Sequence, residues 1–194
     1  MEETLKNLHK AFAGESQARN RYTMAAKQAG KDGYDQLMAI FTKTAEHERE
    51  HAKQLSKMIN QLIVKMGKEQ GPIKIEAEGA AMFSDTATNL KNAIAGEHFE
   101  TTTMYPEFAA KAEEEGLPDI AIRLRAIGKA EAHHEERYAK LLKEVEAQTM
   151  FKKDEEKVWF CRKCGYEHKG TNPPKKCPAC SHEAGYYQLK CEDY

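Results

Sequence analysis

The chain has 194 residues, of which 31% are charged and 40% hydrophobic, and its 30 basic and 31 acidic residues leave a formal net charge of −1. This balance argues against a nucleic-acid-binding surface, and no apolar run reaches the ~18 residues of a membrane span. The acidic start Met1-Glu-Glu-Thr-Leu-Lys6 lacks the basic and apolar parts of a secretory signal, so we expect a cytoplasmic protein without membrane contact.

Four long helices are predicted before the cysteine-rich end of the chain. Gly33, Gly67 and Gly116 mark where the first three end, and Pro118 suits the first turn of the fourth. Residues 71–79 contain Pro72 and lack helical signals, which predicts a crossover that lets the third helix run in the same direction as the second. The third helix is expected to be capped by Ser84 or Asp85. The expected helices cover residues 2–30, 34–66, 84–116 and 118–148.

Four long helices with one long connection are typical of an all-α, ferritin-like four-helix bundle rather than a simple up-and-down bundle. We therefore expect a bundle over residues 1–148 and a charged linker over 149–157. A small domain over 158–194 follows, which contains all five cysteines.

The two halves of the bundle repeat weakly. The segment Ala11-Phe-Ala-Gly-Glu15 recurs as Ala93-Ile-Ala-Gly-Glu97, and each is followed further along by a Glu-x-x-His. These later segments are Glu48 to His51 and Glu131 to His134. Duplicated helical hairpins would place the four segments around a pseudo-two-fold axis.

The inward stripe of each helix is mostly apolar but is interrupted near its middle by Glu, or by Glu and His. Buried carboxylates without partners would each cost several kcal/mol, and two cations between them relieve that cost. Mixed carboxylate and imidazole ligands suit iron or manganese. One Glu from each of two helices and Glu-x-x-His from the other two is the ligand pattern of dinuclear carboxylate bundles. The alternative is a set of solvated surface residues or coiled-coil salt bridges.

Other polar residues of the bundle fit the metal pattern less well. His47, His98 and His133 lie one residue from an inward position, about 100° around the helix, so we expect surface histidines or histidines behind the ligands. Arg19 is expected to pair with a carboxylate. Tyr22 and Tyr105 lie within two turns of expected ligands, so we expect either ordinary core aromatics or hydroxyls that hydrogen-bond ligand carboxylates.

Several segments together resemble the rubrerythrin family, over nearly the whole chain. They are Ala13-Gly-Glu-Ser-Gln-Ala-Arg-Asn-Arg-Tyr22, Glu48-Arg-Glu-His51, Gly96-Glu-His-Phe-Glu100, Met104-Tyr-Pro-Glu-Phe108 and Glu131-Ala-His-His134. The resemblance implies a di-iron site, oxo-bridged when oxidised, whose fixed ligands are Glu15, Glu48, Glu97, Glu131 and His134, with Glu48 and Glu131 bridging. It also implies that Glu100 binds one iron in the diferric state and that His51 replaces it in the diferrous state.

The cysteines form two Cys-x-x-Cys pairs, Cys161 with Cys164 and Cys177 with Cys180. Four thiolates in two such loops bind either a single iron or structural zinc, and the spacing alone leaves both open. Beside a di-iron site iron is the better expectation, and Trp159 and the residues around the pairs resemble rubredoxin. Ser181 stands where rubredoxins usually have glycine.

The resemblance implies a non-haem di-iron peroxidase that reduces hydrogen peroxide to water in oxidative-stress defence. Its expected partners are an electron-donating reductase or rubredoxin and a second copy of the chain, because the linker starts ~20 Å from the metal ligands along the fourth helix. Electrons would then cross a homodimer or a higher homo-oligomer. Two alternatives remain: a ferritin-like protein that oxidises or stores iron with oxygen as oxidant, and a zinc ribbon on a metal-stabilised interaction module.

Overall fold

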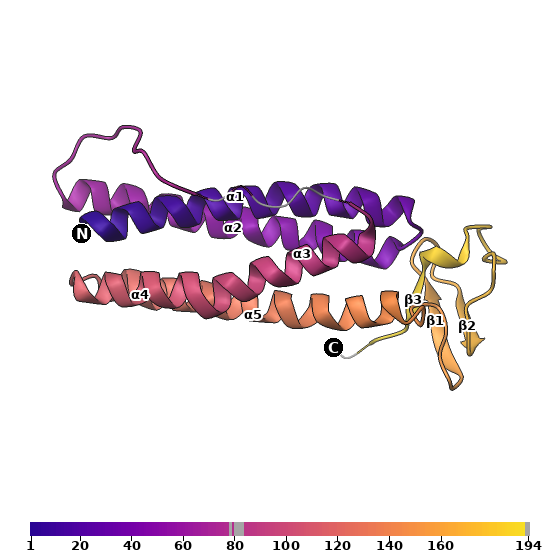
Figure 1. Ribbon diagram of the computed structural model, residues 1–194. Helices are drawn as coiled ribbons and strands as arrows, with labels where there is room; N and C mark the ends of the chain where they lie inside the picture. Colours follow the sequence, from indigo (N-terminus) through magenta and orange to yellow (C-terminus); the bar gives the residue numbers. More distant parts are fainter. Residues whose placement is uncertain (78, 80–83, 193–194) are drawn as a thin grey trace.

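The computed structural model describes residues 1–77, 79 and 84–192, and it places the helices in one elongated bundle (Figure 1). The predicted third helix is divided into three consecutive pieces by a short π-helix. The bundle elements are α1 (Glu2–Lys31), α2 (Asp35–Lys65), α3 (Thr86–Phe99), the π-helix η1 (Glu100–Met104), α4 (Tyr105–Glu114) and α5 (Pro118–Glu146).

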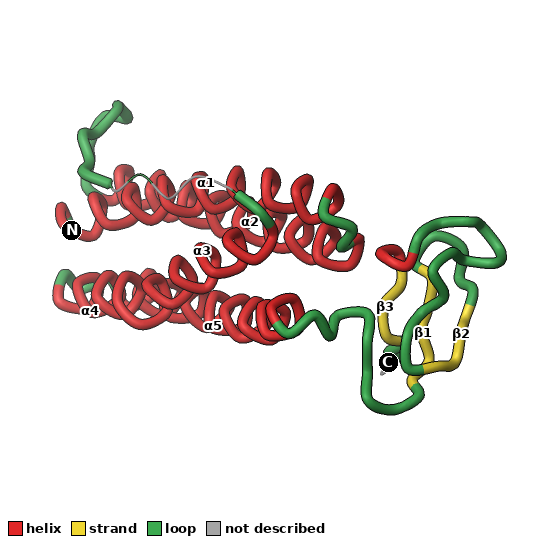
Figure 2. The backbone as a smooth tube through the Cα atoms, turned by 45° about the vertical axis from the view of Figure 1, so that its right-hand side comes forward, coloured by secondary structure: helices red, strands yellow, loops and turns green. Residues whose placement is uncertain are grey.

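The bundle consists of two helical hairpins that face each other. One is α1 with α2, and the other is α3, η1 and α4 with α5 (Figures 1 and 2). α2 ends at one end of the bundle and α3 begins at the other, so α3 runs in the same direction as α2, as predicted. Of the predicted crossover 71–79, residue 78 lies outside the described residues, and the others form neither helix nor strand. Asp85 caps α3 by accepting a hydrogen bond from the Thr88 backbone N–H at 2.9 Å.

Two apolar clusters fill the bundle, one toward each end. The first includes Leu8, Leu55 and Leu124, and the second includes Phe41 and Tyr138. Between them the buried residues are polar. Burying the apolar side chains of both clusters stabilises the fold. This stabilisation offsets the free-energy cost of burying a layer of charged groups at mid-height.

The π-helix η1 has a local cause in the sequence. Pro106 has no N–H and its ring would collide with the carbonyl of Thr102, so the regular α-helical hydrogen bond cannot form there. The chain instead widens, and the Tyr105 N–H bonds to the Glu100 carbonyl five residues back. Insertions of this kind are frequent at functional sites. The helical periodicity of the sequence did not predict it.

The C-terminal domain is a small antiparallel sheet around a metal-binding motif. Its strands are β1 (Lys157–Cys161), β2 (Glu167–Gly170) and β3 (Tyr187–Leu189), in the order β2-β1-β3, with the 3₁₀ turn η2 (Ala184–Tyr186) before β3. Trp159 is fully buried in its core, and its indole N–H donates to the Gly170 carbonyl at 2.9 Å.

This domain packs against the end of the bundle at the α1–α2 turn (Figures 1 and 2). The ring of Phe151, in the linker, stacks on that of Tyr34 with centroids 5.9 Å apart, and an ion pair joins Arg162 of the domain to Asp35. We keep the boundaries 1–148, 149–157 and 158–194 as a proposal. Among the described helices, none combines the length and the apolar character that crossing a membrane requires.

Candidate metal centres

The polar layer of the bundle is built from the carboxylates and histidines that the sequence singles out. Each Glu-x-x-His spans one helical turn, so both side chains point into the bundle from one helix face. Glu15 comes from α1, Glu48 and His51 from α2, Glu97 from α3, and Glu131 and His134 from α5. Apart from His51, whose side chain is 15% exposed, all of them are buried.

These side chains form two groups whose ligand atoms lie within 4.8 Å of one another. His51 anchors one group with Glu15, and His134 anchors the other with Glu97. Glu48 and Glu131 belong to both groups.

The two shared carboxylates each turn one oxygen toward each histidine. For Glu131, Oε1 lies 2.8 Å from the Nδ1 of His51 and Oε2 lies 2.9 Å from the Nδ1 of His134. For Glu48, Oε2 lies 3.0 Å from the Nδ1 of His51 and Oε1 lies 3.3 Å from the Nδ1 of His134. A carboxylate with one oxygen on each side is arranged to bridge two cations.

The atoms that face the centre of the layer make no regular hydrogen bonds, although buried polar atoms ordinarily do. They include both carboxylate oxygens of Glu48 and of Glu131 and the Nδ1 atoms of His51 and His134. Buried, convergent and without hydrogen-bond partners, these oxygen and nitrogen atoms fit two iron-sized cations.

Burial also changes the proton affinity of these groups. It raises the pKa of Glu15 to about 7 and that of Glu48 to about 8, against the lowering effect of His51. At Glu131 burial acts in the same direction, but His134 and His51 outweigh it and lower the pKa. Burial lowers the pKa of His134, but Glu131 and Glu97 outweigh it and raise that pKa to about 10. The layer therefore holds protons that a cation would displace.

Two tyrosines support carboxylates of the layer. The Tyr22 hydroxyl donates to Oε1 of Glu97 at 2.5 Å, and the Tyr105 hydroxyl donates to Oε1 of Glu15. Burial raises the pKa of both phenols well above the ordinary value, so both remain protonated donors. Gly128 allows α5 to approach Tyr105 closely, because a Cβ there would lie 3.1 Å from that of Tyr105.

Glu100 lies next to the layer but outside both groups. Its Oε1 is 4.0 Å from where a Cβ on Gly14 would lie, so the carboxylate reaches toward α1 beside Glu15. Burial, followed by the charge of Glu15, raises the pKa of Glu100 well above its usual range. In this arrangement His51 belongs to a ligand group and Glu100 does not.

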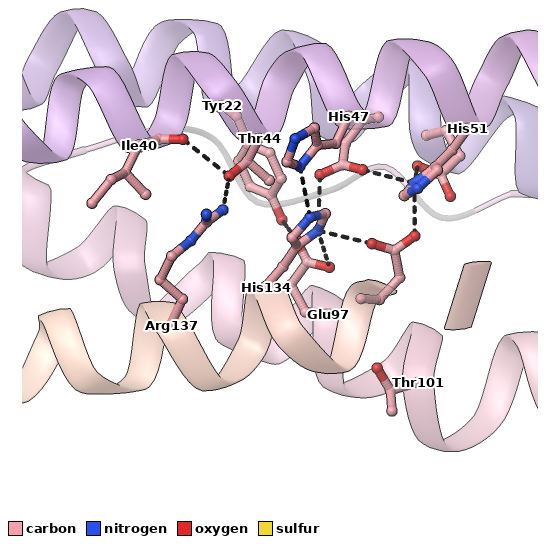
Figure 3. Close-up of polar contacts among 12 residues, drawn as sticks. Tyr22, Ile40, Thr44, His47, His51, Glu97, Thr101, His134 and Arg137 are labelled. Atoms are coloured by element: carbon pink, nitrogen blue, oxygen red, sulfur yellow. Dashed lines mark hydrogen bonds and ion pairs between the residues drawn. The ribbon is translucent and has the colours of Figure 1, made fainter. Parts of the chain in front are cut away.

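The residues expected to lie off the inward stripe divide into two kinds. His98 is exposed and pairs with Glu135 at 3.0 Å, and His133 is exposed. His47 instead reaches the ring of His134, 3.0 Å away between nitrogens (Figure 3). Burial, followed by His134, Lys43 and Arg137, lowers the pKa of His47.

The expectation that Arg19 pairs with a carboxylate is wrong. Arg19 is exposed and lines an outer groove of about 390 Å³ between α1 and α2, together with the cations Arg49 and Lys53. The cause is a shift of the inward stripe, because Ala11 and Ala18 are buried where Phe12 and Arg19 were expected. A stripe through Ala11 and Ala18 and a stripe through Phe12 and Arg19 are displaced by one residue, and the helical period alone does not favour either.

The second centre is the four-cysteine group, whose sulfur atoms lie within 4.8 Å of one another. The sulfur of Cys161 is 3.8 Å from that of Cys180, and the sulfur of Cys164 is 3.6 Å from that of Cys177. In each loop a backbone N–H turns back to the first cysteine: Gly165 to the Cys161 carbonyl and Ser181 to the Cys177 carbonyl. Ser181 has φ of +61°, the left-handed conformation that glycine adopts more easily, as Gly165 does at +79°.

Comparisons with known proteins agree with both centres. The family model described as rubrerythrin matches residues 6–142, and the model described as the rubrerythrin, rubredoxin-like domain matches residues 159–188. The chain belongs to the rubrerythrin family. A putative rubrerythrin of Methanocaldococcus jannaschii is 57% identical, over 100% of this chain and 96% of that protein. A rubrerythrin of Porphyromonas gingivalis is 46% identical, over 98% of this chain and 92% of that protein.

Solved structures of similar fold extend the comparison. Nigerythrin in its fully reduced, all-ferrous state gives a TM-score of 0.62 at 32% identity, covering 96% of this chain and 86% of that one. A bacterioferritin of Desulfovibrio desulfuricans gives a TM-score of 0.65 at 19% identity, covering 75% of this chain and 81% of that one. At this identity the likeness shows only that the fold is ferritin-like. This member of the rubrerythrin family therefore carries a ferritin-like candidate di-iron site of carboxylates and histidines and a rubredoxin-like four-cysteine site.

Proposed function

We propose that the protein is a cytoplasmic peroxidase of the rubrerythrin type, which reduces hydrogen peroxide to water. Loaded with iron, the carboxylate layer would supply two electrons, and these with two protons convert one peroxide molecule into two water molecules. Membership in the family supports the oxidoreductase class, and the rest of the proposal depends on the residues of this chain.

We assign Glu15, Glu97 and His134 as fixed ligands and Glu48 and Glu131 as bridging ligands. Their ligand atoms converge in two groups that share both bridging carboxylates, which supports this division. Tyr22 and Tyr105 hold Glu97 and Glu15 by hydrogen bonds and so fix which oxygen of each faces the metal. Cys161, Cys164, Cys177 and Cys180 are assigned to the single iron.

The observation that carries the peroxidase proposal is the position of Glu100. The half-buried carboxylate of Glu100 lies next to the layer while His51 occupies a place in it, which would give one metal position two alternative ligands. Carboxylate suits the harder ferric ion and neutral imidazole suits the ferrous ion. Exchange between Glu100 and His51 would let the site stabilise both oxidation states.

Electrons are proposed to enter at the four-cysteine iron, from a reductase or a rubredoxin. Within one chain this domain packs near Asp35 at the start of α2, and Glu48 lies ~20 Å further along that helix. Because electron transfer slows steeply with distance, we propose delivery to the carboxylate layer of a partner in a homodimer or a higher homo-oligomer. A monomeric form that turns peroxide over at the full rate through its own four-cysteine iron would contradict this.

The proposed activity is tested by mixing the fully reduced protein with peroxide or with oxygen and following oxidation of the di-iron site. We expect faster oxidation by peroxide. Faster oxidation by oxygen would contradict the proposal and favour the ferritin-like alternative. Metal analysis with visible spectra tests the remaining alternative, a zinc ribbon on a metal-stabilised interaction module, because a zinc-filled four-cysteine site is colourless. The matched variant is Glu100→Gln, which keeps the shape of the side chain and removes its charge, and we expect it to lose the preference for peroxide.

A further inference from the structure

The two histidines of the carboxylate layer differ at the ring nitrogen that faces away from it. The Nδ1 of His134 faces Glu131, Glu48 and Glu97 at 2.9 to 3.6 Å. Its other nitrogen, Nε2, lies 3.0 Å from the Nδ1 of His47 (Figure 3). The two rings are inclined by 15°, with centroids 5.2 Å apart.

When His134 binds a cation, this hydrogen bond has a single possible direction, with His134 as the donor and His47 as the acceptor. The Nδ1 of His134 then offers its lone pair to the metal, so the proton of the neutral ring is on Nε2. That N–H is aimed at the Nδ1 of His47, which accepts it if His47 carries its own proton on Nε2. The far nitrogen of a ligand histidine usually bonds to a carboxylate, a carbonyl or water, and this bond fixes the orientation of the ring.

His51 has no such support. Its Nδ1 faces Glu131, Glu48 and Glu15, but among the described residues no hydrogen bond holds its far nitrogen. Its side chain is 15% exposed, whereas that of His134 is 3% exposed. The His134 ring is therefore enclosed and its far nitrogen is held by a hydrogen bond, whereas the His51 ring is partly open to solvent and its far nitrogen is not held in this way by any described residue.

The sequence explains the difference through the internal repeat. His47 lies four residues before His51 on α2, and from there it reaches across to His134 on α5. The pseudo-two-fold relation that matches Glu48 with Glu131 and His51 with His134 matches His47 with Ala130. An alanine has no acceptor to offer to His51, so only half of the duplicated site has the imidazole support.

We propose that His47 is a positioning residue that makes His134 the permanent imidazole ligand, and that Ala130 at the equivalent place leaves His51 able to leave the metal. The inference depends on the ligand assignment proposed above, and it names the physical difference between the fixed histidine and the exchanging one.

The experiment uses full-length protein loaded with Zn²⁺, and nitrogen-15 NMR to identify which histidine nitrogens carry protons. Zn²⁺ also fills the four-cysteine site, which serves as an internal reference. In the wild-type protein we expect a slowly exchanging proton on the Nε2 of His134 and none on the Nδ1 of His47. A proton on the Nδ1 of His47 would overturn the proposal without any variant.

The variants separate this contact from general stability. His47→Leu removes the acceptor, and we expect about 10- to 100-fold weaker Zn²⁺ binding in the carboxylate layer and rapid exchange of the His134 proton. His47→Gln offers a carbonyl oxygen and is expected to restore most of both properties. The matched control is His133→Gln, an exposed histidine next to His134, which should behave as wild type. Wild-type affinity in His47→Leu, or no recovery in His47→Gln, would contradict the proposal.

The second half of the proposal is tested by Ala130→His, with Ala130→Leu as the control for size. We expect the histidine, and not the leucine, to produce a slowly exchanging proton on the Nε2 of His51 in the Zn²⁺-loaded protein. Its absence in folded Ala130→His would overturn the role given to Ala130. None of these measurements involves peroxide, so a protein that binds Zn²⁺ as described but fails to reduce peroxide would refute the proposed activity alone.

Discussion

The Arg162 guanidinium meets the Asp35 carboxylate, with Nε and Oδ2 2.6 Å apart, and so joins the four-cysteine domain to the first turn of α2. Arg162 lies between two of the metal-binding cysteines, Cys161 and Cys164. At the same contact Gly185 lies directly against the Gly33 backbone, where a Cβ would overlap the carbonyl oxygen. A charge pair and a close backbone approach together hold the second metal centre at one end of the bundle.

Asp35→Asn is expected to loosen this contact. Both side chains are largely buried, so removal of the negative charge leaves the Arg162 guanidinium without its counter-ion, at a cost of about 1–2 kcal/mol. Trp159 is the only tryptophan and is buried in the small domain, so its fluorescence reports unfolding there. We expect a lower midpoint of thermal unfolding by this signal. The control is Glu183→Gln, in an exposed pair with Lys176, which should leave the midpoint unchanged.

Gly185→Ala tests the backbone part of the same contact. Because the added methyl group would overlap the Gly33 carbonyl, the domain must move away from the α1–α2 turn. We expect faster proteolytic cleavage between α5 and β1 than in the wild-type protein. An unchanged rate of cleavage would mean that this contact does not hold the domain.

Tyr105→Phe is expected to weaken metal binding in the carboxylate layer. The hydroxyl bonds to Oε1 of Glu15, and loss of such a partner typically lowers metal affinity 10- to 100-fold. Chelator competition with Co²⁺ or Zn²⁺ measures the change. Tyr138→Phe is the matched control, because Tyr138 is equally buried but its hydroxyl bonds to no carboxylate of the layer. Equal losses in both variants would point to packing rather than to the hydrogen bond.

That the carboxylates and histidines of the layer converge could be predicted from the sequence, because their pattern is local. Glu131 and His134 lie one turn apart on one helix, and a helix brings such residues onto the same face whatever surrounds it. Contacts between helices are different. Nothing near His47 in the sequence indicates that its ring reaches His134, since this depends on how α2 and α5 pack.

Two further features were beyond local patterns. The π-helix at Glu100 follows from a conflict between Pro106 and the preceding turn, and a periodicity that assumes a regular helix cannot represent it. The contact of Arg162 with Asp35 joins residues that are far apart in the chain, and no sequence motif predicts it. What the sequence missed is thus mostly tertiary: which helix faces which, and where the small domain docks.

Metal loading of the carboxylate layer is expected to depend on pH. Glu15 and Glu48, with pKa values of about 7 and about 8, are largely protonated below these values and must release protons before they bind a cation. Apparent affinity should therefore rise with pH through this range, by up to about tenfold per pH unit for each proton released. Calorimetric titration with Zn²⁺ in buffers of different ionisation enthalpy measures the number of protons. Metal binding without proton release would contradict the raised pKa values.

Cys161→Ser separates electron delivery from the peroxide chemistry. Serine offers a hard, weakly acidic hydroxyl in place of a soft thiolate, which weakens iron binding and shifts the potential of the four-cysteine site, so electrons from an external reductase should no longer reach the bundle. Steady-state turnover is expected to be abolished. Glu48 and Glu131 lie in a different domain, so a di-iron site reduced beforehand by a small-molecule reductant should still be oxidised by peroxide in a single turnover. Cys191→Ser, outside the four-cysteine group, is the control and should retain both activities. Loss of both activities in Cys161→Ser would mean that the small domain acts on the bundle structurally, and retention of both would mean that electrons enter elsewhere.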